Sequence, residues 1–323
     1  MTDPPLISAQ ESTDSATAAK TVDEGFFRNP ALLFGFLRVC IYLPLSYGIA
    51  FGLLWSARFF LDAGRDPYSP QNLMIGETVA LIGALAAALI MSRLEKQPFG
   101  AYGLPLSEAR RKFFWQGTLF GLIEISLVIG SAAAFGAYHF GTLVIHGAEL
   151  FRWAIFWGVF FVCVGLYEEF AFRGYVQFTL GRGIGFWPAA ILLSIMFGAR
   201  HLGNPGETTV GIAGIVFAGI FWCFTLQRTG NLWFAVGMHA SFDFGETFLY
   251  SVPDSGVVFP GHLSCATLAG PTWITGGSAG PEASVFDFLA LSILFYAFHR
   301  LYPAKSDRNS RSSTELGLTQ PAE

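Results

Sequence analysis

Eight apolar runs divide this chain, and they restrict its fold more than any other feature of the sequence. About 18 or more consecutive apolar residues are typical of a transmembrane helix, because a helix satisfies its own backbone hydrogen bonds inside lipid. The expected spans cover residues 37–60, 73–91, 114–138, 153–177, 187–202, 208–226, 232–250 and 285–301. The sequence therefore predicts an all-α fold, a polytopic transmembrane bundle of about eight helices.

The composition agrees with a membrane protein. Charged residues make up 13% of the chain, against about a quarter in a soluble domain. The net charge of −4 gives no basic surface, so no nucleic-acid partner is expected. The four cysteines lack the paired spacing of a zinc site, and three of them (Cys40, Cys163 and Cys223) lie in apolar runs, where small buried hydrophobes are expected. The composition therefore predicts that the protein lies in a lipid bilayer.

The two ends of the chain differ from its apolar middle. Residues 1–28 and 304–323 are rich in polar residues and are expected to be disordered tails, so the transmembrane bundle is expected to cover residues 29–303 without a second domain. Lys and Arg are concentrated between the second and third spans and in the C-terminal tail, whereas the link 251–284 has neither. Because basic residues collect on the cytoplasmic side, both termini are predicted to be cytoplasmic.

Three ionisable residues interrupt the fourth apolar run, in the stretch Y-E-E-F-A-F-R-G-Y. A charge inside the bilayer costs roughly 2.5 to 3.5 kcal/mol, so such residues usually have a function and face a partner or a water-filled cavity. Glu169 and Arg173 lie four residues apart on one helix face and are predicted to form an ion pair. Glu168 points about 100° away, which predicts an unpaired carboxylate suited to act as a general base. The alternative is that the span ends at Tyr167 and the charges lie at the membrane interface.

Two later spans each carry a histidine. One contains F-G-A-R-H, ending at His201, and the other contains G-M-H-A-S-F-D-F, with His239 and Asp243 four residues apart. A single intramembrane histidine is more often a core residue, but two histidines with Asp243 and Glu168 form a set with two chemical uses. The set can activate a water molecule directly, with carboxylate and imidazole groups as bases. It can equally hold a divalent metal such as zinc; the candidate ligands are Glu168, His201, His239 and Asp243.

The strings E-E-F-A-F-R, F-G-A-R-H and H-A-S-F-D resemble, in order and separation, the three motifs of a known family. These motifs are E-E-x-x-x-R, F-x-x-x-H and H-x-x-x-N/D, and the family is the CPBP family of intramembrane proteases. It comprises CAAX proteases and bacteriocin-processing enzymes and includes the Ras-converting CAAX prenyl endopeptidases. The resembling core covers about residues 153–248. The stretches R-L-E-K-Q-P-F-G-A-Y-G-L and T-G-G-S-A-G-P-E also resemble bacterial members, which implies a bacterial inner (cell) membrane.

The resemblance implies peptide-bond hydrolysis without a covalent acyl-enzyme. By position, Glu168 and His201 match the pair that activates the attacking water, and His239 and Asp243 match the pair assigned to oxyanion stabilisation. The supporting pair corresponds to Glu169 and Arg173. No H-E-x-x-H pair is present, so a metal-free mechanism that requires no cofactor is preferred over a zinc-dependent one. Asp stands at position 243 where Asn is common, and an ionised Asp cannot donate to an oxyanion.

The function predicted from these residues is that of an intramembrane endopeptidase. Its expected substrate is a membrane-associated protein or peptide, with a prenylated CAAX-type chain as the form that the resemblance suggests. The alternative is a non-catalytic membrane scaffold or bacteriocin-immunity factor that retains the protease fold. A proton-coupled transporter is a third interpretation, weakened because the sequence has no inverted-repeat signal.

Two further glutamates lie in apolar runs and are given no catalytic role. Glu77 in the second run and Glu124 in the third are interpreted as interfacial or snorkelling side chains. Glu124 fits this interpretation less well, because it lies near the middle of its run.

Overall fold

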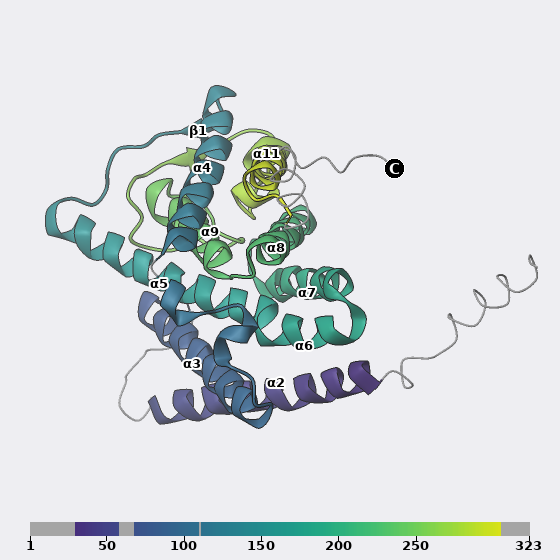
Figure 1. Cartoon of the computed structure of the whole chain (residues 1–323). Coiled ribbons are helices and arrows are strands. Elements are labelled where there is room, and N and C mark those ends of the chain that lie inside the picture. Colours follow the sequence, from purple (N-terminus) through teal and green to yellow (C-terminus); the bar gives the residue numbers. More distant parts are fainter. Residues whose placement is uncertain (1–29, 58–67, 110, 305–323) are drawn as a thin grey trace, which may run out of the picture.

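The computed structural model describes residues 30–57, 68–109 and 111–304, which form a bundle of helices (Figure 1). The tails predicted at 1–28 and 304–323 lie outside the described residues, apart from Ala304. Several of the basic residues from which the orientation was predicted lie outside them as well.

Long helices account for most of the described chain. They are α2 (Pro30–Ala57), α3 (Pro70–Leu94), α4 (Lys112–Ala134), α5 (Gly147–Arg173), α6 (Tyr175–Ile184), α7 (Phe186–Arg200), α8 (Thr209–Thr229), α9 (Trp233–Phe244) and α11 (Val285–Leu301). The shorter elements are η3 (Phe99–Tyr102), η4 (Leu106–Glu108), η5 (His201–Gly203), the π-helical turn η6 (Gly245–Leu249), α10 (Thr272–Thr275) and η7 (Pro281–Ala283). Two short strands, β1 (Tyr138–His139) and β2 (Thr267–Leu268), pair antiparallel. The predicted all-α bundle of about eight helices is confirmed, since α5 and α6 meet at Gly174.

Five described segments are long and apolar enough to cross a bilayer, which makes this an integral membrane protein. They are Leu32–Ala57, Pro70–Leu94, Lys112–Ala134, Gly147–Ile184 and Thr209–Thr229. The other three predicted spans are shorter helices: α7 has 15 residues, α9 has 12 and α11 has 17. The predicted ranges 187–202 and 285–301 match α7 and α11 closely, whereas the range 232–250 divides into α9 and η6. In α9 every residue from Trp233 to Asp243 is buried. Most of its side chains are apolar because they pack against other parts of the protein.

Local sequence signals account for several helix ends. The Thr208 hydroxyl accepts a hydrogen bond from the Gly211 amide at the start of α8, and Ser284 does the same for the Phe286 amide at the start of α11. Helix α8 ends at Gly230, whose φ of 68° lies in the left-handed region that glycine adopts without strain. At Gly174 an added Cβ would lie 2.4 Å from the Phe170 carbonyl oxygen, so the junction of α5 and α6 requires a glycine.

Helix α9 lies at the centre of the site-bearing half of the bundle, where it packs against α4, α5 and α8 (Figure 1). The contact with α4 is made through glycines. A Cβ on Gly117 would lie 1.9 Å from the Phe234 carbonyl oxygen, and one on Gly237 would lie 2.2 Å from the Phe114 carbonyl oxygen. Small residues allow membrane helices to approach closely, so this packing fixes the position of α9.

Gly117→Ala is expected to lower the free energy of unfolding by about 1 to 3 kcal/mol, because the new methyl group meets backbone that has no free space. Thermal unfolding in detergent measures the effect. The matched control is Gly130→Ala on the same helix, where an added Cβ meets nothing within 4 Å. Equal melting temperatures for the two variants would show that α4 and α9 are not tightly packed.

The chain between η6 and α11 folds back onto the helices. The Gly206 amide donates to the Gly256 carbonyl, the Gly256 amide donates to the Ala279 carbonyl, and the Leu263 amide donates to the Phe248 carbonyl. The sequence analysis treated this segment only as a link without Lys or Arg. Its backbone bonds instead hold it beside the C-terminal end of α9, where its acidic residues contribute to the site.

Candidate active site

All four predicted catalytic residues line one cavity of about 260 Å³. They come from three elements: Glu168 from the end of α5, His201 from the start of η5, and His239 and Asp243 from α9. Segments far apart in the sequence thus contribute titratable side chains to the same cavity.

Glu168 is paired with a cation, and the prediction that it is unpaired is wrong. The Arg200 guanidinium donates a hydrogen bond to Oε1 of Glu168 and forms an ion pair with it. The other carboxylate oxygen, Oε2, lies 3.7 Å from Nε2 of His239. Arg200 directly precedes His201 in F-G-A-R-H, so the sequence contained the signal: a second membrane charge that needed a partner.

The predicted ion pair between Glu169 and Arg173 is confirmed. Nη1 of Arg173 lies 3.2 Å from Oε1 of Glu169, and both side chains are fully buried. The guanidinium carbon also lies 4.3 Å from the centroid of the Phe197 ring, a distance typical of a cation–π contact. The motif E-E-F-A-F-R therefore supplies one buried pair within α5 and one carboxylate, Glu168, directed to the cavity.

His239 connects the two glutamates. Its Nδ1 lies 3.0 Å from Oε1 of Glu169, and because a carboxylate only accepts, Nδ1 carries the proton. Its Nε2 is directed to Oδ2 of Asp243, 3.4 Å away, and to Glu168. The imidazole stacks on Trp222 with ring centroids 4.5 Å apart. The histidine is thereby held in one orientation, with Nε2 toward the cavity.

His201 is held by its own helix end. Its Nδ1 lies 2.9 Å from the Phe197 carbonyl oxygen, and since a carbonyl only accepts, Nδ1 donates and Nε2 keeps a free lone pair. The Phe197 ring meets the imidazole edge to face, with centroids 5.0 Å apart. No hydrogen bond joins His201 to the other three predicted catalytic residues within the described chain, so these groups meet only across the cavity.

The same cavity contains acidic residues that the sequence analysis missed. Asp254, Glu282 and Asp287 line it, although the first two come from the segment treated as a link. Burial, and after it the nearby Asp243 carboxylate, raises the pKa of Asp254 well above its ordinary value. Burial, and after it Asp254, does the same to the pKa of Glu282. The lengths of the apolar runs do not indicate that the segments carrying Asp254 and Glu282 meet at the cavity.

Two glutamates interpreted as interfacial or snorkelling line the same cavity, and for the buried Glu124 that interpretation is wrong. Glu77 lines the cavity, with its Oε2 buried and without a hydrogen-bond partner among the described residues. Glu124 lines it as well and is only 4% exposed. Both carboxyl groups therefore lie on the wall of the cavity that contains the predicted catalytic residues.

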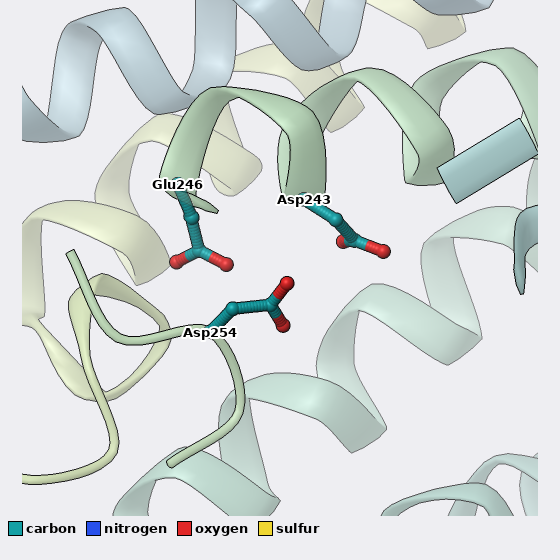
Figure 2. Close-up of side chains that lie close together, drawn as sticks. All are labelled: Asp243, Glu246 and Asp254. Carbon is teal, nitrogen blue, oxygen red and sulfur yellow. The ribbon is translucent and has the colours of Figure 1, made fainter. Parts of the chain in front are cut away.

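A group of acidic side chains beside the predicted catalytic residues has metal-ligand geometry. Within the described chain, the acidic or histidine side chains close enough to share an ion are Asp243, Glu246 and Asp254, whose ligand atoms lie within 4.8 Å of one another (Figure 2). Of the four candidate ligands in the sequence analysis, only Asp243 belongs to this group. Glu168 and His239 lie outside this group, although Nε2 of His239 is 3.4 Å from Asp243 and 3.7 Å from Glu168.

Comparisons with known proteins agree with the motif analysis. The family of type II CAAX prenyl endopeptidases described as Rce1-like matches residues 150–245, which run from α5 to the start of η6 and include all six predicted catalytic and supporting residues. No curated protein and no solved structure matches the chain. A protease family implies a protein or peptide substrate. Residues 150–245 therefore form an Rce1-like CAAX prenyl endopeptidase domain, and the family that this domain matches is a hydrolase family.

Proposed function

We propose that this protein is an intramembrane endopeptidase that hydrolyses a peptide bond of a membrane-associated protein or peptide. The observation that carries the proposal is the presence of Glu168, His201, His239 and Asp243 around one cavity of about 260 Å³ inside the bundle. A concave site with a few convergent polar groups is the usual form of an active site. Prenylated CAAX-type chains are the first substrates to test, because the matched family is named for them.

In the proposed mechanism, Glu168 and His201 activate water. Glu168 takes a proton as the water oxygen attacks the scissile carbonyl carbon, and the proton passes to the amide nitrogen as the C–N bond breaks. A general base must be ionised. The Arg200 guanidinium compensates the charge of Glu168 and so favours its ionised form. His201 presents Nε2, because its Nδ1 is bound to the Phe197 carbonyl.

His239 is proposed to stabilise the oxyanion. Glu169 holds its Nδ1, which leaves Nε2 directed to the cavity. When the imidazole is charged, Nε2–H is a donor to the developing negative charge. The Asp243 carboxylate, 3.4 Å from Nε2, favours that charged form, so its role is to support His239 and not to donate. No step of this mechanism needs a cofactor; a zinc ion held by the same side chains is the competing account.

The proposed location is a bacterial inner (cell) membrane, with both termini in the cytoplasm. The five long apolar helices support a location in a membrane, and the clustering of Lys and Arg supports the predicted orientation of the termini. A cysteine-accessibility experiment on the two termini tests the orientation directly.

Comparative proteomics of membranes tests the function. Cells that produce the wild-type protein are compared with cells that produce Glu168→Gln at the same level, and new peptide termini are identified. We expect cleavage products only with the wild type, carrying one ¹⁸O atom in the new carboxylate when the reaction runs in H₂¹⁸O. If the variant restores every phenotype of a deletion strain and no products differ, the protein is a scaffold or immunity factor.

A further inference from the structure

Three buried carboxyl groups converge beside the proposed catalytic residues. Asp243 lies on α9, Glu246 follows in the π-helical turn η6, and Asp254 lies in the loop after η6. Figure 2 shows the three side chains facing a common space, and one ligand atom of each lies within 4.8 Å of the others. Like charges this close repel one another, and either a proton or a bound cation relieves the repulsion.

Glu246 supplies a second and independent observation. It is completely buried, yet neither of its carboxylate oxygens has a hydrogen-bond partner among the residues that the structure describes. Buried polar groups are almost always paired, so an unpaired one needs an explanation. Its side chain is directed toward Asp254 (Figure 2). A ligand between these groups would satisfy both oxygens.

The surrounding elements hold the three groups in place. The π-helical turn follows α9 directly, and such turns are frequent at functional sites. The Thr247 hydroxyl donates to Oδ2 of Asp254 at 3.1 Å, which fixes that carboxylate. The Asp254 amide in turn donates to the Val257 carbonyl. Hydrogen bonds therefore hold the Asp254 carboxylate and its loop in place.

The lining of the cavity contains more carboxyl groups than basic groups. Seven carboxyl groups line the described cavity: Glu77, Glu124, Glu168, Asp243, Asp254, Glu282 and Asp287. One guanidinium, that of Arg200, lines it too, and it is paired with Glu168. His239 is directed to Asp243 but lies outside the group formed with Glu246 and Asp254. A cation bound between Glu246 and Asp254 would supply positive charge that this group of side chains does not contain.

We infer that Asp243, Glu246 and Asp254 bind a hard divalent cation, of the class of Mg²⁺, Mn²⁺ and Ca²⁺. Three carboxylates form an all-oxygen donor set, which such ions prefer, whereas zinc prefers nitrogen and sulfur ligands. The adjoining cavity of about 260 Å³ has room for water molecules that complete the coordination shell. Asp243 contacts both the cation and His239, so the ion supports the orientation of that histidine.

Mn²⁺ titration of the purified full-length protein in detergent tests the inference. After treatment with EDTA, binding is followed by loss of the free-Mn²⁺ paramagnetic resonance signal. We expect one Mn²⁺ per chain, displaced by Mg²⁺ or Ca²⁺, and a melting temperature that rises with Mn²⁺ concentration. The wild-type protein alone decides the main question: no binding at millimolar Mn²⁺ overturns the proposal, whatever the protease activity is.

Matched variants locate the site. Glu246→Gln and Asp254→Asn are expected to weaken Mn²⁺ binding at least about tenfold, since even indirect partners of a metal contribute that much. Glu77→Gln makes the same chemical change in the same cavity but outside the cluster, and is expected to bind Mn²⁺ like the wild type. Using two ligand variants keeps the test valid if one does not fold. Wild-type affinity in both, or binding that is lost only in His239→Ala, overturns the assignment.

Discussion

Glu168→Gln is expected to lower the rate of peptide cleavage by about 10² to 10⁴-fold, the range that a positioned general base contributes. The amide has the shape of the carboxylate and still accepts a hydrogen bond from Arg200, but it cannot take a proton from water. The measurement is kcat for a membrane-tethered peptide in liposomes, using a substrate identified by proteomics or a prenylated CAAX-type peptide.

Glu77→Gln is the control for this experiment. It removes a carboxylate from the wall of the same cavity but not from the proposed catalytic set, so kcat should stay within about threefold of the wild type. Melting temperatures of both variants exclude a loss of folding. A wild-type kcat for the Glu168→Gln protein would show that Glu168 is not the general base.

Arg173→Met is expected to have the largest effect on stability, a loss of about 3 to 5 kcal/mol in the free energy of unfolding. Removing one partner of a buried ion pair leaves an uncompensated charge, and Arg173 and Glu169 are both fully buried, 3.2 Å apart. Chemical unfolding in detergent gives the value. Adding Glu169→Gln to the same protein should restore part of the loss, because the stranded charge is then removed as well.

The surface pair of Arg111 with Glu108 provides the matched comparison. Its atoms are 2.9 Å apart, but the Arg111 side chain is 67% exposed, so Arg111→Met should cost less than about 1 kcal/mol. If Arg173→Met costs no more than Arg111→Met, the buried pair does not stabilise the fold and its role is confined to holding His239.

Helix positions were well predicted where the apolar signal was long. The runs that predicted α4 and α8 match those helices to within a few residues. Helix α9 shows the limit of the method. Its apolar sequence continues into η6, so the sequence predicts one full span at 232–250, whereas the structure has a 12-residue helix enclosed by protein and then a π-helical turn. Lipid and protein interiors select the same side chains, so hydropathy does not distinguish them.

In the candidate site, the interactions predicted correctly were the local ones. Glu169 and Arg173 are four residues apart, and helix geometry alone brings them together. Glu168 and Arg200 are separated by 32 positions, and their ion pair depends on how α5 packs near the end of α7. Asp254 and Glu282 reach the cavity only because the segment after η6 folds back onto the bundle.

The sequence by itself determined that this is a helical membrane protein with a protease-like set of residues, because apolar run length and i, i+4 spacing are local properties of a chain. Tertiary structure alone decided which charges meet between different helices. It gave Glu168 a guanidinium partner, placed His239 against Glu169, and brought Asp254 beside Asp243 and Glu246. Electrostatic interactions depend on distances between groups, and for residues on different helices packing sets those distances.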